Sequence, residues 1–173
     1  MLWPVSIIPT DLKLSANISP QGNGGSCNND IPPIQPTPIL LQRLSPDGLK
    51  PLNNTPPIQI LDRDPLDGPV IEAPALSRTS DGRYILFFSS NCYDSALYDV
   101  SYAIADTIEG PYTKYGPFAL SETTGLFGPG GAHIMQADDG LAVQQMAFHA
   151  GPVGQRWMYT AELAVEGVIV GTV

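Results

Sequence analysis

The sequence predicts an all-β protein, and three observations carry that prediction. Gly and Pro, with 17 and 18 residues, make up about a fifth of the 173-residue chain, where average usage gives roughly 12%. No window shows sustained apolar spacing at i, i+3, i+4 and i+7, which would mark an amphipathic helix. Asp-Gly pairs at residues 47–48, 81–82 and 139–140 stand between short apolar runs, a strong local signal for β-hairpins.

The first 38 residues are expected to be irregular. Most of the 18 prolines lie in residues 1–75, and proline lacks the amide that a long central strand must donate. Residues 22–25 and Pro32-Pro33 interrupt short apolar pieces, as turn and loop signals do. From Ile39 onward the pattern changes to short extended runs separated by turns, the first of them at Asp47-Gly48.

The second turn, at Asp81-Gly82, is predicted to join two strands. Residues 73–77 precede it, and the continuous apolar run 84–88 follows it. Such a run is typical of a strand that is buried on both faces of a sheet. Residues 98–103 then alternate between large apolar and small or polar side chains, which has the period of a strand.

The third turn repeats this arrangement. Residues 132–135 precede Asp139-Gly140 and residues 141–148 follow it, and in a final strand Trp157, Tyr159, Ala161 and Leu163 face one way. Strand pairs at irregular spacing suggest the blades of a β-propeller, but a β-sandwich would give similar local signals. The pattern alone leaves both architectures open.

Composition excludes several classes of protein. Eight basic residues face 17 acidic ones, giving a net charge of −9, so the basic surface of a nucleic-acid binder is not expected. No stretch approaches the ~18 apolar residues that a membrane span needs. The start of the chain, residues 1–4, shows no intact signal peptide, because a basic region followed by an apolar one is missing.

The cysteines and two glycosylation sequons indicate whether the protein is secreted into an oxidising compartment. Cys27 and Cys92 match no zinc spacing, although one long-range bridge is possible in an oxidising compartment. Asn17-Ile18-Ser19 and Asn53-Asn54-Thr55 are glycosylation sequons, which favour a secreted origin.

Several segments, taken in order, resemble glycoside hydrolase family 43. Residues 67–76 resemble the segment of that family that bears its acid, and residues 81–90 and 98–103 continue the resemblance. Residues 24–29 and 36–42 resemble fungal members in particular. Residues 109–113 look like the family's signature between blades. The remaining matches are residues 128–131, 148–150 and 156–159.

The resemblance implies a five-bladed β-propeller that acts on arabinan, xylan or arabinoxylan with inversion at the anomeric carbon. It covers residues 22–173, and blades of roughly 40–45 residues allow only about three in that length. We therefore expect a partial β-propeller over residues 22–173, like the C-terminal part of the family domain and so truncated, behind an irregular segment over residues 1–21. The family also implies an extracellular protein with plant cell-wall polysaccharide as its partner.

Three carboxylates do the chemistry in this family: a base Asp, an Asp that tunes the acid, and an acid Glu. Glu72 matches the acid, and its apolar neighbours suit a proton donor. Asp11 and Asp30, the carboxylates before Ile39, match neither aspartate, so impaired hydrolysis is expected. The alternatives are a catalytically inactive remnant or carbohydrate-binding module, and a structural β-protein in which Glu72 and Arg156 would lie on unrelated surfaces.

Other positions are expected to bind sugar. Arg156 matches the family arginine that reaches the sugar, although it could instead be a surface charge beside Trp157. Asn91 lies where the family's rim contacts begin, and Tyr93, with Tyr98 and Trp157, could form a stacking platform or belong to the core.

No metal or cofactor is predicted. Gly131 stands where many family members carry a histidine, and His133 has no second ligand partner in the sequence, while His149 is expected to be a structural or rim residue. A bridge between Cys27 and Cys92 would tie the irregular segment to the rim. A partial propeller leaves sheet edges open, so marginal stability or self-association is expected.

Overall fold

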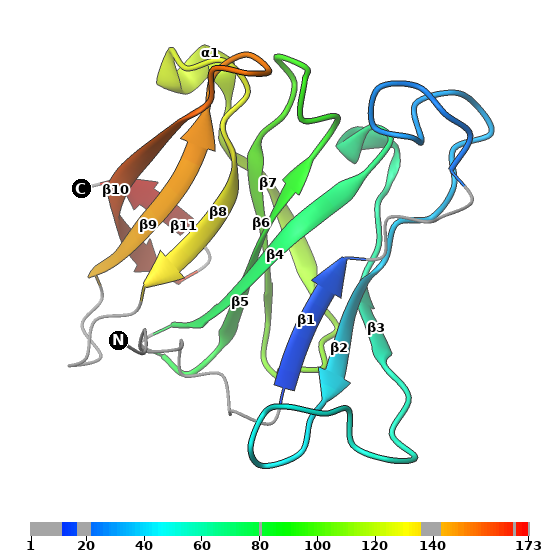
Figure 1. Cartoon of the computed structure of the whole chain (residues 1–173). Coiled ribbons are helices and arrows are strands. Elements are labelled where there is room, and N and C mark those ends of the chain that lie inside the picture. The colour runs from blue at the N-terminus through cyan, green and yellow to red at the C-terminus, as the bar shows by residue number, and fades with distance from the viewer. Residues whose placement is uncertain (1–11, 17–21, 80, 136–142, 168, 173) are drawn as a thin grey trace.

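Three antiparallel sheets lie side by side in the computed structural model, which describes residues 12–16, 22–79, 81–135, 143–167 and 169–172 (Figure 1). The all-β prediction is confirmed for these ranges, where the helical elements are the short η1 (Pro65–Asp67) and α1 (Ser121–Thr124). Within the same ranges, no helix has the length and apolar character that a bilayer-spanning segment needs.

The first sheet has the order β1-β2-β3 and contains β1 (Leu12–Ala16), β2 (Ile39–Arg43) and β3 (Ile58–Leu61). β1 lies in the segment that was expected to be irregular, and this expectation is wrong for its five residues. Proline excludes long central strands, but a short proline-free stretch can still pair, as β1 does with β2. The Asp47-Gly48 turn lies between β2 and β3 as predicted, and the Gly48 amide donates to the Ser45 carbonyl at 2.7 Å.

The second sheet contains β4 (Ile71–Arg78), β5 (Tyr84–Ser90), β6 (Val100–Ala105) and β7 (Thr113–Ala119), each antiparallel to the next. The hairpin at Asp81-Gly82 is confirmed, with β4 and β5 as its strands. β5 is buried along nearly its whole length, as its apolar run predicts. β6 is also buried on both faces, because the two other sheets cover the two faces of this middle sheet.

The third sheet has the order β11-β10-β9-β8. It contains β8 (Gly130–Met135), β9 (Val143–Ala150), β10 (Trp157–Glu166) and β11 (Ile169–Thr172). β8 and β9 pair as predicted, while the Asp139-Gly140 turn itself lies outside the described residues. The strand predicted from Trp157 to Leu163 is confirmed as part of β10. It is not the final strand, as was expected, because β11 follows it and pairs with it.

One motif has a different place from the one expected. Residues 109–113 were expected between two blades, but they connect β6 and β7 within the second sheet. The Gly110 amide donates to the Thr107 carbonyl at 3.0 Å and the Thr107 hydroxyl donates to the Gly110 carbonyl at 2.7 Å. These two bonds close a tight turn of an outer hairpin, so the motif is a feature of one sheet.

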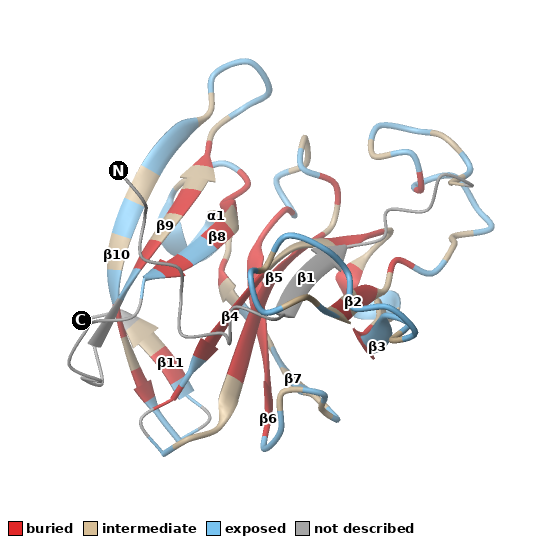
Figure 2. Cartoon of the chain, turned by 60° about the horizontal axis from the view of Figure 1, so that its bottom comes forward, coloured by how far each residue is buried: buried red, intermediate tan, exposed pale blue. Residues whose placement is uncertain are grey.

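The core lies in two layers on either side of the second sheet. Phe87 and Ile134 belong to the layer shared with the third sheet, and Ile39 and Phe88 to the layer shared with the first. Figure 2 shows the buried residues concentrated along β4, β5 and β6.

The three sheets are arranged as neighbouring blades. β4 contacts β1 on one side and β8 on the other, so the first strands of the three sheets lie together. Three sheets fanned around such a line are a partial propeller, and the described strands form three separate sheets that do not close into a barrel. The β-sandwich alternative, which needs two sheets packed face to face, is excluded.

Candidate active site

Glu72 lies at the start of β4, where the first strands of the sheets meet. Its partner across the strand pair is Ser89, and the pairing of β4 with β5 shifts between Glu72 and Ala75. Ala73 within this bulge has φ 50°, a conformation that costs free energy for a residue with a side chain. A bulge redirects the side chains beside it, so this local backbone sets the direction of the Glu72 carboxylate.

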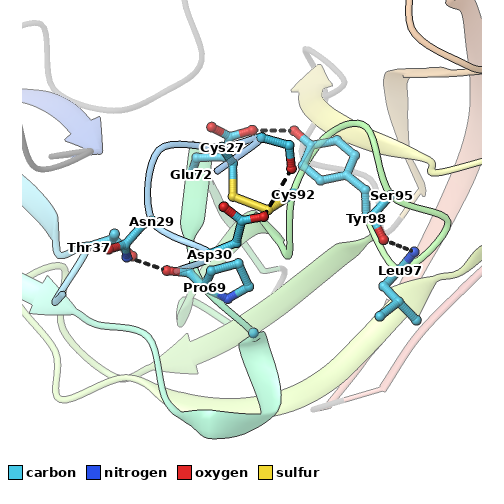
Figure 3. Close-up of a disulfide and its surroundings, with 12 residues drawn as sticks. Cys27, Asn29, Asp30, Thr37, Pro69, Glu72, Cys92, Ser95, Leu97 and Tyr98 are labelled. Atoms are coloured by element: carbon cyan, nitrogen blue, oxygen red, sulfur yellow. Dashed lines mark hydrogen bonds between the residues drawn. A yellow bond between two sulfur atoms is a disulfide. The ribbon is translucent and has the colours of Figure 1, made fainter. Parts of the chain in front are cut away.

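Tyr98 holds that carboxylate. Its hydroxyl donates to Glu72 Oε1 at 2.8 Å (Figure 3), and the ring is only 2% exposed. Burial, followed by the negative charge of Glu72, raises the pKa of the Tyr98 hydroxyl. Tyr98 therefore keeps its proton and remains a donor to Glu72.

Gly130 makes room for the Tyr98 ring. A Cβ at residue 130 would lie 2.0 Å from Cε1 of Tyr98. Gly130→Ala is therefore expected to displace the ring and to lower the free energy of unfolding by about 1–3 kcal/mol, measured by denaturant unfolding. Gly171→Ala is the matched control, because a Cβ on that strand glycine meets nothing within 4 Å. Equal effects of the two substitutions would contradict this account of the packing.

Arg156 lies over the ring of Tyr98, whose hydroxyl is bonded to Glu72. Its guanidinium carbon is 5.5 Å from the centre of the Tyr98 ring, and Nε donates to Nδ1 of His149 at 2.6 Å. An arginine has five N–H donors, and the other four are used by backbone carbonyls. These carbonyls belong to Tyr93, Gly128, His149 and Gly151. Since one tyrosine joins Glu72 and Arg156, the two do not lie on unrelated surfaces.

His149, on β9, contacts both Tyr98 and Arg156. Its imidazole stacks on the Tyr98 ring with the centres 6.1 Å apart and the planes 19° from parallel. Burial, and after it the charge of Arg156, lowers the pKa of His149, so the ring is neutral at pH 7. Nε2 lies over Gly131, where an added Cβ would be 2.4 Å away. The Gly131 amide in turn donates to the Ser89 hydroxyl at 2.8 Å.

Asn91 and Tyr93 lie in the connection between β5 and β6. The Asn91 backbone amide donates to the carbonyls of Asp67 and Val70 at 2.9 and 3.1 Å, in a left-handed conformation with φ 66°. The Tyr93 side chain is exposed, while its carbonyl accepts from Arg156 at 3.0 Å. Asn91 is thus held at the acidic loop, which is residues 62–70 between β3 and β4, and Tyr93 lies next to Arg156. Sugar binding by either residue stays a prediction.

A disulfide joins Cys27 to Cys92, across 65 residues of sequence. The bridge ties the segment before β2 to the connection between β5 and β6, and Figure 3 shows it in the same view as Glu72 and Tyr98. Ligand atoms of Cys27, Asp30 and Cys92 lie within 4.8 Å of one another. Since metals bind the thiolate form of cysteine, the bridged pair offers no such ligands.

The buried Asn29 fixes the same segment. Its side chain donates to the carbonyls of Gln35 and Pro69 at 2.9 and 2.7 Å, and it accepts from the Gln35 amide at 3.0 Å. Pro69 belongs to the acidic loop just before Glu72. The segment before β2 is therefore held against the loop that leads into the candidate acid.

A second polar cluster lies on the opposite face of the second sheet. Asp99 is buried and accepts from the hydroxyls of Ser90 and Ser101 at 2.7 and 2.9 Å. Successive residues of a strand point to opposite faces, so Ser90 faces away from Ser89, the partner of Glu72. On the same far side, Lys114 of β7 pairs with two carboxylates of the acidic loop, Asp64 at 3.0 Å and also Asp67.

Burial raises the pKa of Asp99 above the ordinary value of 3.8. The folded state then binds this proton more tightly than the unfolded state, so stability falls as pH rises through the folded-state pKa. Asp99→Asn is therefore expected to raise the free energy of unfolding at pH 7, with no gain near pH 3. Denaturant unfolding at both pH values measures the difference.

Asp81→Asn is the matched control for that substitution. A hydrogen bond from Arg83 lowers the pKa of Asp81 to about 2, so its stabilising contribution is present above pH 3.8 and is lost as pH falls toward 2. The two variants should therefore deviate from the wild type in opposite directions at pH 7. Deviation in the same direction would contradict the contrast between a buried carboxylate and a paired one.

Similarity to solved structures extends over most of the chain. A thermostable family-43 glycoside hydrolase matches 83% of this chain and 49% of its own, with 26% identity and a TM-score of 0.68. An endo-1,4-β-xylanase from Bacteroides thetaiotaomicron matches 79% and 50%, with 28% identity and a TM-score of 0.65. An α-L-arabinanase from Cellvibrio cellulosa, in complex with arabinohexaose or without it, shares the fold at 19% identity.

These similarities place the chain among the propeller folds of glycoside hydrolases. The fold is that of glycoside hydrolase family 43, as the motifs suggested. The chain spans about half the length of the thermostable family-43 hydrolase and of the xylanase. No protein-family model and no curated protein sequence matches it.

Proposed function

We propose that this chain carries the acid-bearing part of a glycoside hydrolase that acts on plant polysaccharides containing arabinose or xylose. The observation that carries the proposal is the hydrogen bond from the buried Tyr98 to Glu72, at the line where the sheets meet. The matched structures include a xylanase and an arabinanase. Together these supports favour a sugar site beside Glu72.

The proposed role of Glu72 is proton donation to the leaving oxygen. Inverting hydrolysis needs this acid and a base that activates water, with the two carboxyl groups ~6.5–9.5 Å apart. The family resemblance assigns the base and the tuning aspartate to no residue of this chain, so we propose that its hydrolytic activity is impaired. Arg156 and the rim residues Asn91 and Tyr93 would help to shape the sugar site.

An inactive carbohydrate-binding module is the second candidate function. It is favoured by the surroundings of the nearby aspartates. Asp67 is paired with Lys114, and Asp99 is enclosed with two serine hydroxyls on the far face of the sheet. Such a module would bind sugars beside Glu72 and leave them intact.

We also propose an extracellular location and association between copies. The Cys27–Cys92 bridge is typical of oxidising compartments. The outer strands β3, β7 and β11 each end a sheet of the described chain, and unpaired edges favour pairing with another chain. Sedimentation at increasing protein concentration measures this association.

The experiment combines binding and product analysis. The protein is titrated calorimetrically with arabinotriose and xylotriose, and the same mixtures are analysed for released arabinose and xylose. Glu72→Gln is compared with Glu166→Gln, an exposed glutamate at the end of β10. Binding that depends on Glu72 supports a sugar site, and the products separate the enzyme from the binding module. No binding of either sugar would reject both.

A further inference from the structure

We infer that the Nε2–H group of His149 donates a hydrogen bond to a sugar hydroxyl beside Glu72, and that Arg156 is a positioning residue that fixes the imidazole in this form. The inference deepens the proposed function and rests on it, because it takes the Glu72 carboxylate to face the sugar. Arg156 would then act on the sugar through His149.

The first step is the tautomer of His149. The guanidinium of arginine always keeps its protons, so Nε of Arg156 is the donor in the 2.6 Å contact with Nδ1 of His149. Nδ1 must therefore carry a lone pair, and in a neutral imidazole the proton is then on Nε2. The remaining N–H groups of Arg156 are held by carbonyls, which prevents the guanidinium from turning away.

The second step is the place of Nε2. It lies over Gly131, in space that any side chain at residue 131 would fill. Gly131 is hydrogen-bonded to Ser89, and Ser89 pairs directly with Glu72. Tyr98 hydrogen-bonds Glu72 at its hydroxyl and stacks on His149 at its ring. Two sets of contacts therefore connect the imidazole with the carboxylate. One passes through Tyr98, and the other passes through Gly131 and Ser89.

The third step is the chemistry that Nε2–H offers. The His149 side chain is only half-buried, and its Nε2–H is a neutral donor of the kind that suits a sugar hydroxyl. A metal ligand would need a lone pair on Nε2, which the bond from Arg156 to Nδ1 excludes. A protonated carboxyl keeps acceptor capacity beside its O–H donor, so Glu72 can give its proton to the leaving oxygen and still accept from a second hydroxyl of the same sugar.

A nitrogen NMR spectrum of the imidazoles tests the tautomer. At pH 7 the wild-type protein should show His149 as the Nε2–H form, and Arg156→Lys should convert this signal to a mixture of tautomers. His133, exposed on β8, provides an internal control whose signal should not change. A wild-type His149 that carries its proton on Nδ1, or a signal that Arg156→Lys leaves unchanged, would overturn the role given to Arg156.

Calorimetric binding of arabinotriose and xylotriose tests the donor. His149→Phe should weaken binding of the preferred sugar roughly 2–10-fold, as expected for the loss of one hydrogen bond, and Arg156→Lys should weaken it less. His133→Phe should leave binding unchanged, and circular dichroism establishes that each variant is folded. If folded His149→Phe binds as well as the wild type while Glu72→Gln does not, the inference fails and the proposed function stands. If neither sugar binds the wild type, both fail.

Discussion

Replacing Glu72 by Gln is expected to lower azide-dependent cleavage of alkyl arabinosides or xylosides by roughly 10²–10⁴-fold. Azide can attack the anomeric carbon in place of an activated water, so it removes the need for a base. The bond to the leaving oxygen then breaks, Glu72 gives its proton to that oxygen, and a glycosyl azide of inverted configuration forms. Glutamine has no proton of comparable acidity. Without a proton from an acid, the leaving oxygen must depart as an alkoxide, which is a poor leaving group.

The leaving group provides the control for this prediction. 4-Nitrophenolate leaves without a proton, so Glu72→Gln should affect 4-nitrophenyl glycosides much less than alkyl glycosides. Rates are measured from the azide product, with Glu166→Gln as the variant that should behave like the wild type. Equal losses for both kinds of substrate would contradict a role of Glu72 as proton donor.

Removing the Cys27–Cys92 bridge is expected to lower the free energy of unfolding by about 4 kcal/mol, from the loop-closure entropy of the unfolded chain. The large value follows from the sequence separation of 65 between the two cysteines. Typical domains have only about 5–15 kcal/mol of stability, so the loss is a large part of the total. The double variant Cys27→Ser, Cys92→Ser is compared with the wild type by guanidinium unfolding.

The same experiment has a chemical counterpart. The wild-type protein in a reducing agent should unfold at the same denaturant concentration as the double variant, and the reducing agent should not affect the variant. Asn29, which holds the same segment through the Gln35 and Pro69 carbonyls, remains in both. An unchanged midpoint on loss of the bridge would contradict its structural role.

The inner part of the fold could be predicted because its signals are local. The apolar run of β5 and the Asp81-Gly82 turn specify a buried hairpin without reference to the rest of the chain. β7 was not predicted, because its outer position leaves every second residue exposed and Gly116 and Pro117 interrupt it. β1 was not predicted either, because the strand with which it pairs, β2, lies beyond the proline-rich segment.

The candidate site shows the same division. Glu72 was found from the residues around it, but its partner Tyr98 lies 26 positions away in sequence. Their contact depends on the bulge at Ala73 and on the missing side chain at Gly130. The neighbouring glycines Gly130 and Gly131 were the signal in the sequence that other side chains pack closely against this segment. His149 had no such signal, because its place follows from hydrogen bonds that Arg156 makes after folding.

A competing place for a sugar lies away from this group. A groove of about 280 Å³ is lined by Leu41, Arg43, Pro56, Ile58 and Glu109, among others. An exposed ion pair of 3.2 Å between Arg43 and Glu109 borders it. Its lining does not include Glu72, so a ligand in this groove would have no access to the candidate acid.

A crystal structure of the protein with arabinotriose or xylotriose tests the central claim most directly. We expect a glycosidic oxygen within about 2.6–3.2 Å of the Glu72 carboxylate, with sugar density over Tyr98 and Gly131. Sugar bound only in the groove beside Arg43 and Glu109, with an empty surface at Glu72, would contradict the assignment of a glycoside-cleaving site to this part of the chain.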